Sequence, residues 1–141
     1  MPYQTNMDPK TKGELSEAKV LSRLMELGDT VLTPFGENCD YDLVIDDGVE
    51  LRRVQVKTGR MEDGKVVASL SRTRVNSKGS TRKNYDDGSI DAFVIYCHDN
   101  DAAYWVDLED AGKVQISIRV DPPHERHRNN RNINWADAHR L

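Results

Sequence analysis

The spacing of apolar residues predicts a helix near the start of the chain. Between Gly13 and Leu27, apolar residues recur at intervals close to 3.6, as they do on one face of an amphipathic helix. Gly28 comes directly after this segment and is a helix stop signal. The preceding residues are polar and contain no apolar run, so we expect residues 1–12 to form a flexible arm.

Short β-prone runs come after the helix and predict a sheet. They are rich in Val, Ile and aromatic residues and are separated by turn signals. We expect strands at residues 30–33, 41–45, 50–58, 66–70, 91–97, 104–106 and 114–120. Asp46-Asp47-Gly48 is the turn expected to join the second and third strands into a hairpin.

Two further segments differ in character from these strands. The stretch 71–88 is polar, basic and rich in Ser, Asn and Gly, which predicts a long loop. Asp107 is expected to cap a single helical turn that ends near Gly112. The region 122–141 predicts a basic tail, in which Ile133, Trp135 and Ala136 are candidates for docking on the body.

The length of 141 residues fits one compact domain, which we place at residues 13–121. No run of about 18 apolar residues is present, so no transmembrane helix is expected. Cys39 and Cys97 match no ligand pattern and are expected to be reduced. These features favour a cytoplasmic protein without a membrane partner.

Charge is unevenly distributed along the chain. The formal net charge is −4, which alone argues against a nucleic-acid-binding protein. However, residues 52–83 hold ten basic and only two acidic residues, and such a stretch can attract a polyanion. An ordinary solvated surface remains the alternative. The preferred candidates for contacts with nucleic-acid phosphates are Arg60, Arg72, Arg74, Arg82 and Lys83.

The predicted hairpin brings together chemically useful side chains. Because side chains alternate along a strand, Gln55 and Lys57 project from one face, while Val54 and Val56 face the core. Asp42 opens the partner strand. An acid, an amide oxygen and a lysine can therefore converge at the open end of the hairpin.

Phosphodiester hydrolysis requires such a group of side chains. Carboxylate and amide oxygens suit Mg²⁺, which prefers oxygen ligands. The ion polarises a phosphate and lowers the pKa of water, while a neighbouring lysine offsets the developing charge. We therefore predict metal ligation by Asp42 and Gln55, with Lys57 as a catalytic residue. A surface ion pair between Asp42 and Lys57 remains the alternative.

The first helix offers another acid. Glu17 shares a helix face with Val20, Leu21 and Leu24, and an acid on that face is costly unless it is paired or binds a cation. Glu17 is thus the third predicted ligand. Glu14 lies one turn earlier and could substitute, although we favour its role as a first-turn acid interacting with the helix dipole.

The order of these motifs resembles the PD-(D/E)XK nuclease superfamily. Within it, the chain resembles the group I intron-associated endonucleases and, more distantly, the archaeal Holliday junction resolvases. The motifs that carry the resemblance are Gly13-x-x-x-Glu17, Tyr41-Asp42-Leu43 and Gln55-Val56-Lys57-Thr58, with support from Gly28 and Tyr104-Trp105-Val106. They span most of residues 13–112.

The resemblance implies an α/β fold with a restriction-endonuclease-like core, in which helices flank a mixed, mostly antiparallel sheet. It implies a DNA endonuclease that depends on Mg²⁺, with Mn²⁺ as a substitute, and that acts on double-stranded DNA as a homodimer or higher oligomer. Glu17 then matches the helix glutamate, Asp42 the central metal ligand and Lys57 the catalytic lysine. Gln55 replaces the acid of the wider superfamily and brings no charge, although the intron-associated family itself has glutamine there.

Two other functions stay open. A structure-selective resolvase would act on branched DNA, and a DNA-binding module with weak or lost catalysis would result from a metal site weakened by Gln55. A zinc site at His124-x-x-His127 is not favoured, because the tail offers no companion cysteine.

Overall fold

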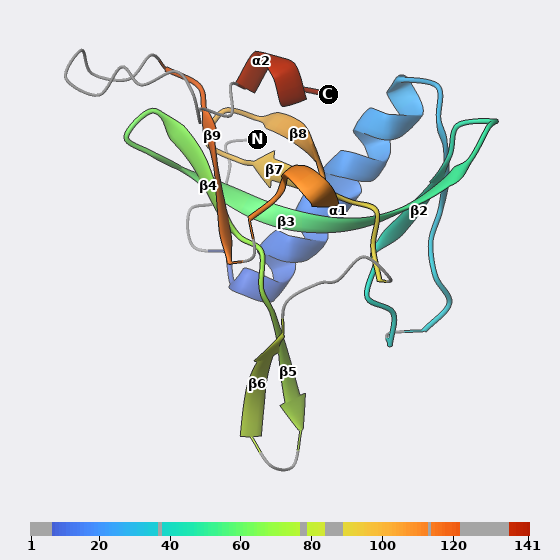
Figure 1. Ribbon diagram of the computed structural model, residues 1–141, viewed down its shortest axis with the longest axis horizontal. Coiled ribbons are helices and arrows are strands. Elements are labelled where there is room, and N and C mark those ends of the chain that lie inside the picture. Colours follow the sequence, from blue (N-terminus) through green and yellow to red (C-terminus); the bar gives the residue numbers. More distant parts are fainter. Residues whose placement is uncertain (1–6, 37, 77–78, 84–88, 113, 122–135) are drawn as a thin grey trace.

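The computed structural model describes residues 7–36, 38–76, 79–83, 89–112, 114–121 and 136–141 (Figure 1). For residues 72–76, 79–83, 137 and 138 it describes the backbone alone. A seven-stranded mixed sheet forms the body, and the long helix α1 crosses one of its faces. The architecture is the α/β core expected from the sequence. Ile133, Trp135, His124 and His127 lie outside the described residues.

Helix α1 spans Pro9–Glu26 and so begins four residues earlier than expected. Asp8 caps it by accepting a 3.0 Å hydrogen bond from the N–H of Thr11, and Pro9 occupies the first turn, where a missing N–H costs nothing. Gly28, at φ +96°, ends the helix. The arm expected at residues 1–12 is therefore wrong for Pro9–Lys12, and residues 1–6 lie outside the described part.

The strands confirm most of the expected sheet. Their bounds are β1 (Thr30–Leu32), β2 (Leu43–Asp46), β3 (Leu51–Glu62), β4 (Lys65–Ser69), β7 (Ala92–Cys97), β8 (Ala102–Asp107) and β9 (Gln115–Arg119). The order is β1-β2-β3-β4-β9, and β7 joins β3 and β8. Among the described strands, β3 with β7 is the one parallel pair, so the sheet is mostly antiparallel as predicted.

The long strand β3 organises the site. It pairs with β2 over residues 51–54, with β7 over 54–59 and with β4 over 60–62. Strands β2 and β4 thus pair with opposite ends of β3. The middle of β3, which carries Gln55 and Lys57, lies between these two paired stretches. We call this region, where Asp42 and the start of β2 part from β3, the fork.

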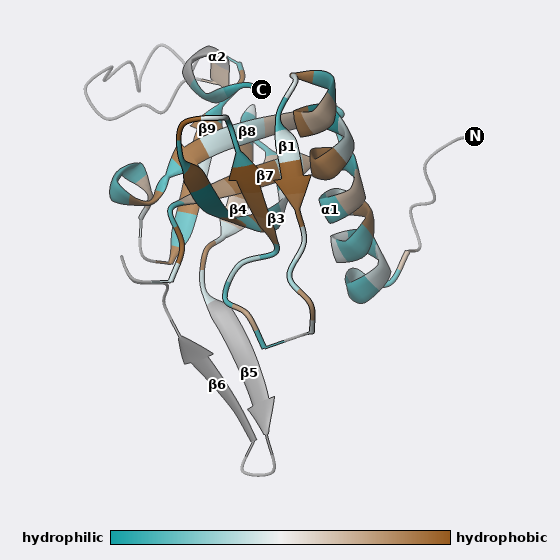
Figure 2. Cartoon of the chain, turned by 90° about the vertical axis from the view of Figure 1, so that its right-hand side faces the viewer, coloured by the Kyte–Doolittle hydropathy of each residue, from teal (hydrophilic) through white to brown (hydrophobic). Residues whose placement is uncertain are grey.

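Two apolar clusters cover the two faces of the sheet. Val54 and Val56 pack with Val20 and Leu24 of α1 on one face, as the alternation of β3 predicts. The other cluster gathers side chains of β4, β7, β8 and β9, together with Ala136 at the start of the short helix α2 (Ala136–His139). Figure 2 shows α1 along one side of the sheet and α2 above the ends of its strands, near β8 and β9. Ala136 therefore docks on the body as expected.

The expectation of a loop over residues 71–88 is wrong for most of its length. Strands β5 (Arg72–Asn76) and β6 (Gly79–Lys83) form an antiparallel hairpin that projects from the body (Figures 1 and 2). The polar composition hid this pairing, because a two-stranded ribbon without a core needs no apolar alternation. Residues 84–88 lie outside the described part.

Smaller elements agree closely with the sequence. Asp107 precedes a single 3₁₀ turn, η1 (Leu108–Asp110), although its side chain makes no capping hydrogen bond. Ile116 and Ile118 of β9 are buried as predicted, whereas Val114 lies before the strand and is exposed. Neither described helix has the length and apolar character required to span a bilayer.

Candidate active site

Asp42 lies in the fork, one residue before β2 begins. Its N–H donates to the carbonyl of Val54 at 2.8 Å, which adds one hydrogen bond to the pairing of β2 with β3. Its side chain then accepts a 2.8 Å hydrogen bond from the N–H of Val56, just beyond the stretch that β2 pairs. The carboxylate is therefore held against the edge of β3 by the strand itself.

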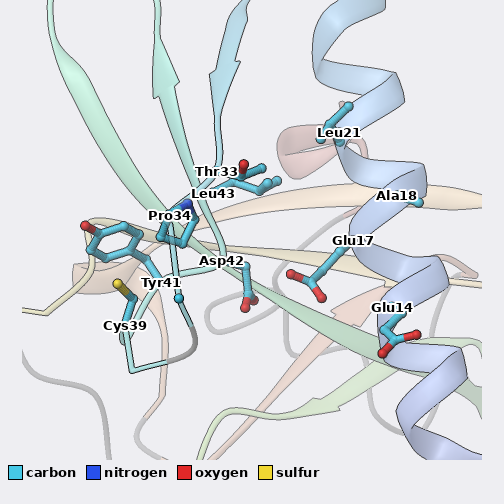
Figure 3. A pocket seen from close by; sticks show the side chains of 11 residues that line it. Glu14, Glu17, Ala18, Leu21, Thr33, Pro34, Cys39, Tyr41, Asp42 and Leu43 are labelled. Carbon is cyan, nitrogen blue, oxygen red and sulfur yellow. The ribbon is translucent and has the colours of Figure 1, made fainter.

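Glu17 approaches the same point from helix α1. Figure 3 shows its carboxyl group and that of Asp42 pointing toward one another. A hydrogen bond between two carboxyl groups requires a shared proton, and the pKa of Glu17 is raised to about 7. Burial is the main cause, followed by the charge of Asp42, the hydrogen bond to it and the charge of Glu14.

The pKa of Asp42 is also raised, because burial disfavours its charged form. The N–H of Val56, the hydrogen bond with Glu17 and the positive charge of Lys57 oppose this rise. The two acids therefore hold fewer than two negative charges near neutral pH. A divalent cation between them would replace the shared proton and offset both charges.

Lys57 completes the group from the middle of β3. It is half-buried, and burial lowers its pKa while the charge of Asp42 opposes that change. Its Nζ donates to the carbonyl oxygen of Ser71 at 3.2 Å, just after β4. The ammonium is thus positioned between Asp42 and the base of the β5–β6 hairpin.

Gln55 lies on the face of β3 that carries Lys57, in register with Phe93 of β7. The Leu43–Val54 pair is the last between β2 and β3, so Asp42 and Gln55 are the next residues along the two strands. The structure thus gathers Glu17, Asp42 and Lys57 and places Gln55 beside them along the backbone.

A pocket of about 430 Å³ opens beside the two acids. One wall is α1, including Glu14, and the other is the loop between β1 and β2 (Figure 3). The loop contributes Thr33, Pro34, Gly36, Cys39 and Tyr41. This wall could not be predicted from the sequence. Pro34 and Gly36 indicate a loop, but neither residue indicates that the loop lies opposite α1.

Glu14 requires a correction. Because α1 begins at Pro9, its first turn holds no acidic residue, so the favoured interpretation of Glu14 as a first-turn acid is wrong. Glu14 instead lines the pocket, and its charge helps to raise the pKa of Glu17. The error came from placing the start of the helix at Gly13.

The predicted phosphate contacts fall into two groups. Arg60 is exposed at the end of β3 and forms a 3.2 Å ion pair with Glu62. The others lie on the projecting hairpin, Arg72 and Arg74 on β5 and Arg82 and Lys83 on β6. The register pairs Arg72 with Lys83 and Thr73 with Arg82, which concentrates basic residues near the base of the hairpin.

A second acidic group lies elsewhere, at η1. Asp107, Glu109 and Asp110 are close enough to hold an ion, and the described residues contain no other such group of three His, Cys, Asp or Glu side chains. Glu109 and Asp110 are exposed, and Asp107 accepts a 2.8 Å hydrogen bond from the indole of Trp105. No motif in the sequence marks this cluster as a site, and exposed acids of this kind are common.

Comparison with known proteins identifies the family of the chain. No curated protein matches the chain. Among solved structures, a bacterial homing endonuclease, I-Ssp6803I, is similar to it, with 27% identity and a TM-score of 0.74 over 94% of this chain and 90% of that one. The PD-(D/E)XK endonuclease family matches residues 7–141. The site lies within that range, and the chain belongs to the PD-(D/E)XK endonuclease family.

Proposed function

We propose that the protein is a Mg²⁺-dependent endonuclease that hydrolyses phosphodiester bonds of double-stranded DNA, as a homing endonuclease does. The observation that carries the proposal is the meeting of Glu17 and Asp42 beside Lys57 in the fork. The similarity to a bacterial homing endonuclease supports the same function.

The donor set fits a hard divalent ion. Glu17 and Asp42 supply two carboxylates whose pKa values are both raised by burial, and the charge of Asp42 raises that of Glu17 further. A bound cation would offset these unfavourable effects. The Gln55 oxygen would be a third, neutral ligand. Mg²⁺, or Mn²⁺ in its place, would supply Lewis-acid polarisation of the scissile phosphate.

The remaining chemistry falls to the chain itself. Lys57 is held between Asp42 and the Ser71 carbonyl, so its ammonium can orient the attacking water and offset charge that develops on the phosphate. Burial lowers the pKa of Lys57, which makes proton exchange with water easier than for an exposed lysine.

The basic hairpin is proposed to hold the substrate. It carries Arg72, Arg74, Arg82 and Lys83, and it begins directly after Ser71, the partner of Lys57. Phosphate contacts from the hairpin would therefore align the duplex with the fork. A homodimer or higher oligomer would supply the second site required to cut both strands.

The test is nicking of supercoiled plasmid in Mg²⁺ by the wild type and by Lys57→Ala. We expect cleavage by the wild type, none in EDTA, and a loss of roughly 10²–10³-fold in the variant. Undiminished cleavage by Lys57→Ala would refute the assignment of the site.

Two alternative functions have distinct outcomes in the same series. A preference for four-way junctions over linear duplexes would indicate the resolvase function. DNA binding without cleavage in either Mg²⁺ or Mn²⁺ would indicate a binding module. The structural similarity to a homing endonuclease favours neither alternative.

A further inference from the structure

A buried polar network ties the helix of the site to its strand. Ser16, next to Glu17, has no exposed surface and is the one buried polar residue among those described. Its hydroxyl lies 2.6 Å from the hydroxyl of Thr58, next to Lys57, and 2.9 Å from Nε2 of His98, which comes directly after β7. One side chain thus connects two segments of the sheet with the helix that covers them.

The number of available protons decides which groups donate and which accept in this network. The Ser16 hydroxyl donates to the carbonyl of Lys12 at 3.0 Å. Because it has a single proton, a hydroxyl that donates to Lys12 accepts from Thr58 and from His98 with its two lone pairs. In that arrangement His98 is the tautomer with its proton on Nε2. Burial and the charges of Lys12 and Lys19 lower the pKa of His98, and a hydrogen bond with the backbone of Lys12 and the charge of Asp99 oppose this change.

The network lies where it can fix the orientation of Glu17 and Lys57. Successive residues on a helix differ by about 100° in direction, so fixing Ser16 also fixes the rotation that aims Glu17 at Asp42. Successive residues on a strand face opposite ways, so Thr58 can bond on the helix side while Lys57 faces the other side. The network therefore connects the immediate neighbours of Glu17 and Lys57.

Burial alone does not explain these residue types. Apolar side chains fill the same face of the sheet one turn along the helix, where Val20 and Leu24 pack on Val54 and Val56. A buried hydroxyl is stabilising only when its hydrogen bonds are made, and such a network specifies one arrangement of its elements. Here the arrangement of α1 on β3 sets the distance between Glu17 and Lys57.

We propose that Ser16, Thr58 and His98 are positioning residues that hold Glu17 and Lys57 in the geometry required to bind the divalent ion. The inference rests on the proposed function, because it assumes that Glu17 is a ligand. None of Ser16, Thr58 and His98 is among the predicted metal ligands or catalytic residues.

The test compares two substitutions of Thr58 in the full-length protein. Thr58→Val keeps the shape and removes the hydroxyl, whereas Thr58→Ser keeps the hydroxyl and removes the methyl group. The probe is Mn²⁺, with affinity measured by electron paramagnetic resonance in the absence of DNA. The Mg²⁺ concentration for half-maximal plasmid nicking is the second readout.

We expect Thr58→Val to weaken Mn²⁺ binding about 10-fold, as loss of a group that orients a ligand does. The Mg²⁺ midpoint should rise by a similar factor, and Thr58→Ser should stay within about twofold of the wild type. His98→Gln, which keeps a donor near Nε2, should be milder than His98→Leu. Leu24→Val is the control, since it loosens α1 two turns from Glu17 without touching the network.

Wild-type Mn²⁺ affinity in Thr58→Val would overturn the inference while leaving the proposed function intact. Equal weakening by Leu24→Val or Thr58→Ser, at matched thermal stability, would also overturn it, because packing alone would then explain the effect. A wild type that binds Mn²⁺ but cuts no DNA would refute the proposed function only. A wild type that binds no Mn²⁺ would refute both.

Discussion

Two groups of acids on this chain differ in what surrounds them. Asp107, Glu109 and Asp110 cluster at η1, where Glu109 and Asp110 are exposed to water. Glu17 and Asp42 meet in the fork, half-buried beside a lysine. Counted as oxygen ligands, the cluster at η1 is the richer group, with three carboxylates against two.

Burial nevertheless makes the fork the more favourable of the two acidic groups for binding a cation. Exposed carboxylates are already stabilised by water, so an ion gains little by joining them. In the fork, water is partly excluded, the pKa of Glu17 is raised to about 7, and a cation would remove an unfavourable interaction. The raised pKa of Glu17 therefore favours the fork over η1 as the proposed metal site.

The largest expected effect is the loss of Asp42, the proposed central metal ligand. Asp42→Asn removes a charge from the fork, and we expect DNA cleavage to fall by roughly 10²–10³-fold. The amide also turns its NH₂ group toward the N–H of Val56 in one rotamer, so thermal unfolding should be measured in parallel. Cleavage within about tenfold of the wild type in a folded variant would contradict the central role of Asp42.

The hairpin should control affinity for DNA instead of chemistry. We expect Arg72→Gln/Arg74→Gln to weaken DNA binding and to reduce the slope of log affinity against log salt by about 1 for each lost phosphate contact. Lys10→Gln/Arg140→Gln is a control with the same charge change. Equal salt slopes for the two double variants would show that the hairpin makes no special contact.

Gln55 is the residue through which the site can be strengthened. Gln55→Glu adds a negative ligand next to Asp42, so we expect Mn²⁺ affinity to rise about tenfold. Isothermal titration calorimetry measures this change directly. An unchanged affinity would remove Gln55 from the proposed ligand set.

A smaller effect concerns pH. Because the folded protein raises the pKa of Glu17 from 4.5 to about 7, its protonated form is favoured, and this contribution to stability is lost as pH rises through 7. Without metal, unfolding at a pH of about 5.5 should therefore be harder than at about 8, by on the order of 1 kcal/mol for a half-exposed group. Thermal melts of Glu17→Gln should show a flatter pH dependence in this range.

The smallest effect is expected at η1. Glu109→Gln/Asp110→Asn should leave Mn²⁺ affinity and cleavage within about twofold of the wild type, because both side chains are exposed. A tenfold loss of metal binding would reverse the comparison between the two acidic groups.

Features set by local periodicity were predictable from the sequence. Alternation along residues 54–57 separated two core valines from Gln55 and Lys57, and the structure has Val54 and Val56 buried against α1. The turn at Asp46-Asp47-Gly48 was also predicted, and Gly48 has φ +89° there. The mostly antiparallel sheet came from the resemblance, since the parallel β3–β7 contact joins segments distant in the chain.

Features that depend on contacts between distant segments were hidden in the sequence. The hydroxyl of Ser16 meets Thr58 and His98, which lie 42 and 82 residues away, and no periodic pattern indicates such a meeting. The loop residues that line the pocket, Thr33, Pro34, Gly36, Cys39 and Tyr41, lie opposite α1, and no local pattern in the sequence indicates that neighbour. The β5–β6 hairpin was missed because its residues carry no apolar alternation.

The most direct test of the central claim is an electron paramagnetic resonance titration with Mn²⁺ of the wild type, of Asp42→Asn and of Glu109→Gln/Asp110→Asn. If the fork holds the ion, the wild type and the double variant bind one Mn²⁺ with similar affinity, and Asp42→Asn loses that ion. Binding that survives in Asp42→Asn and disappears in the double variant would contradict the assignment of the metal site to the fork.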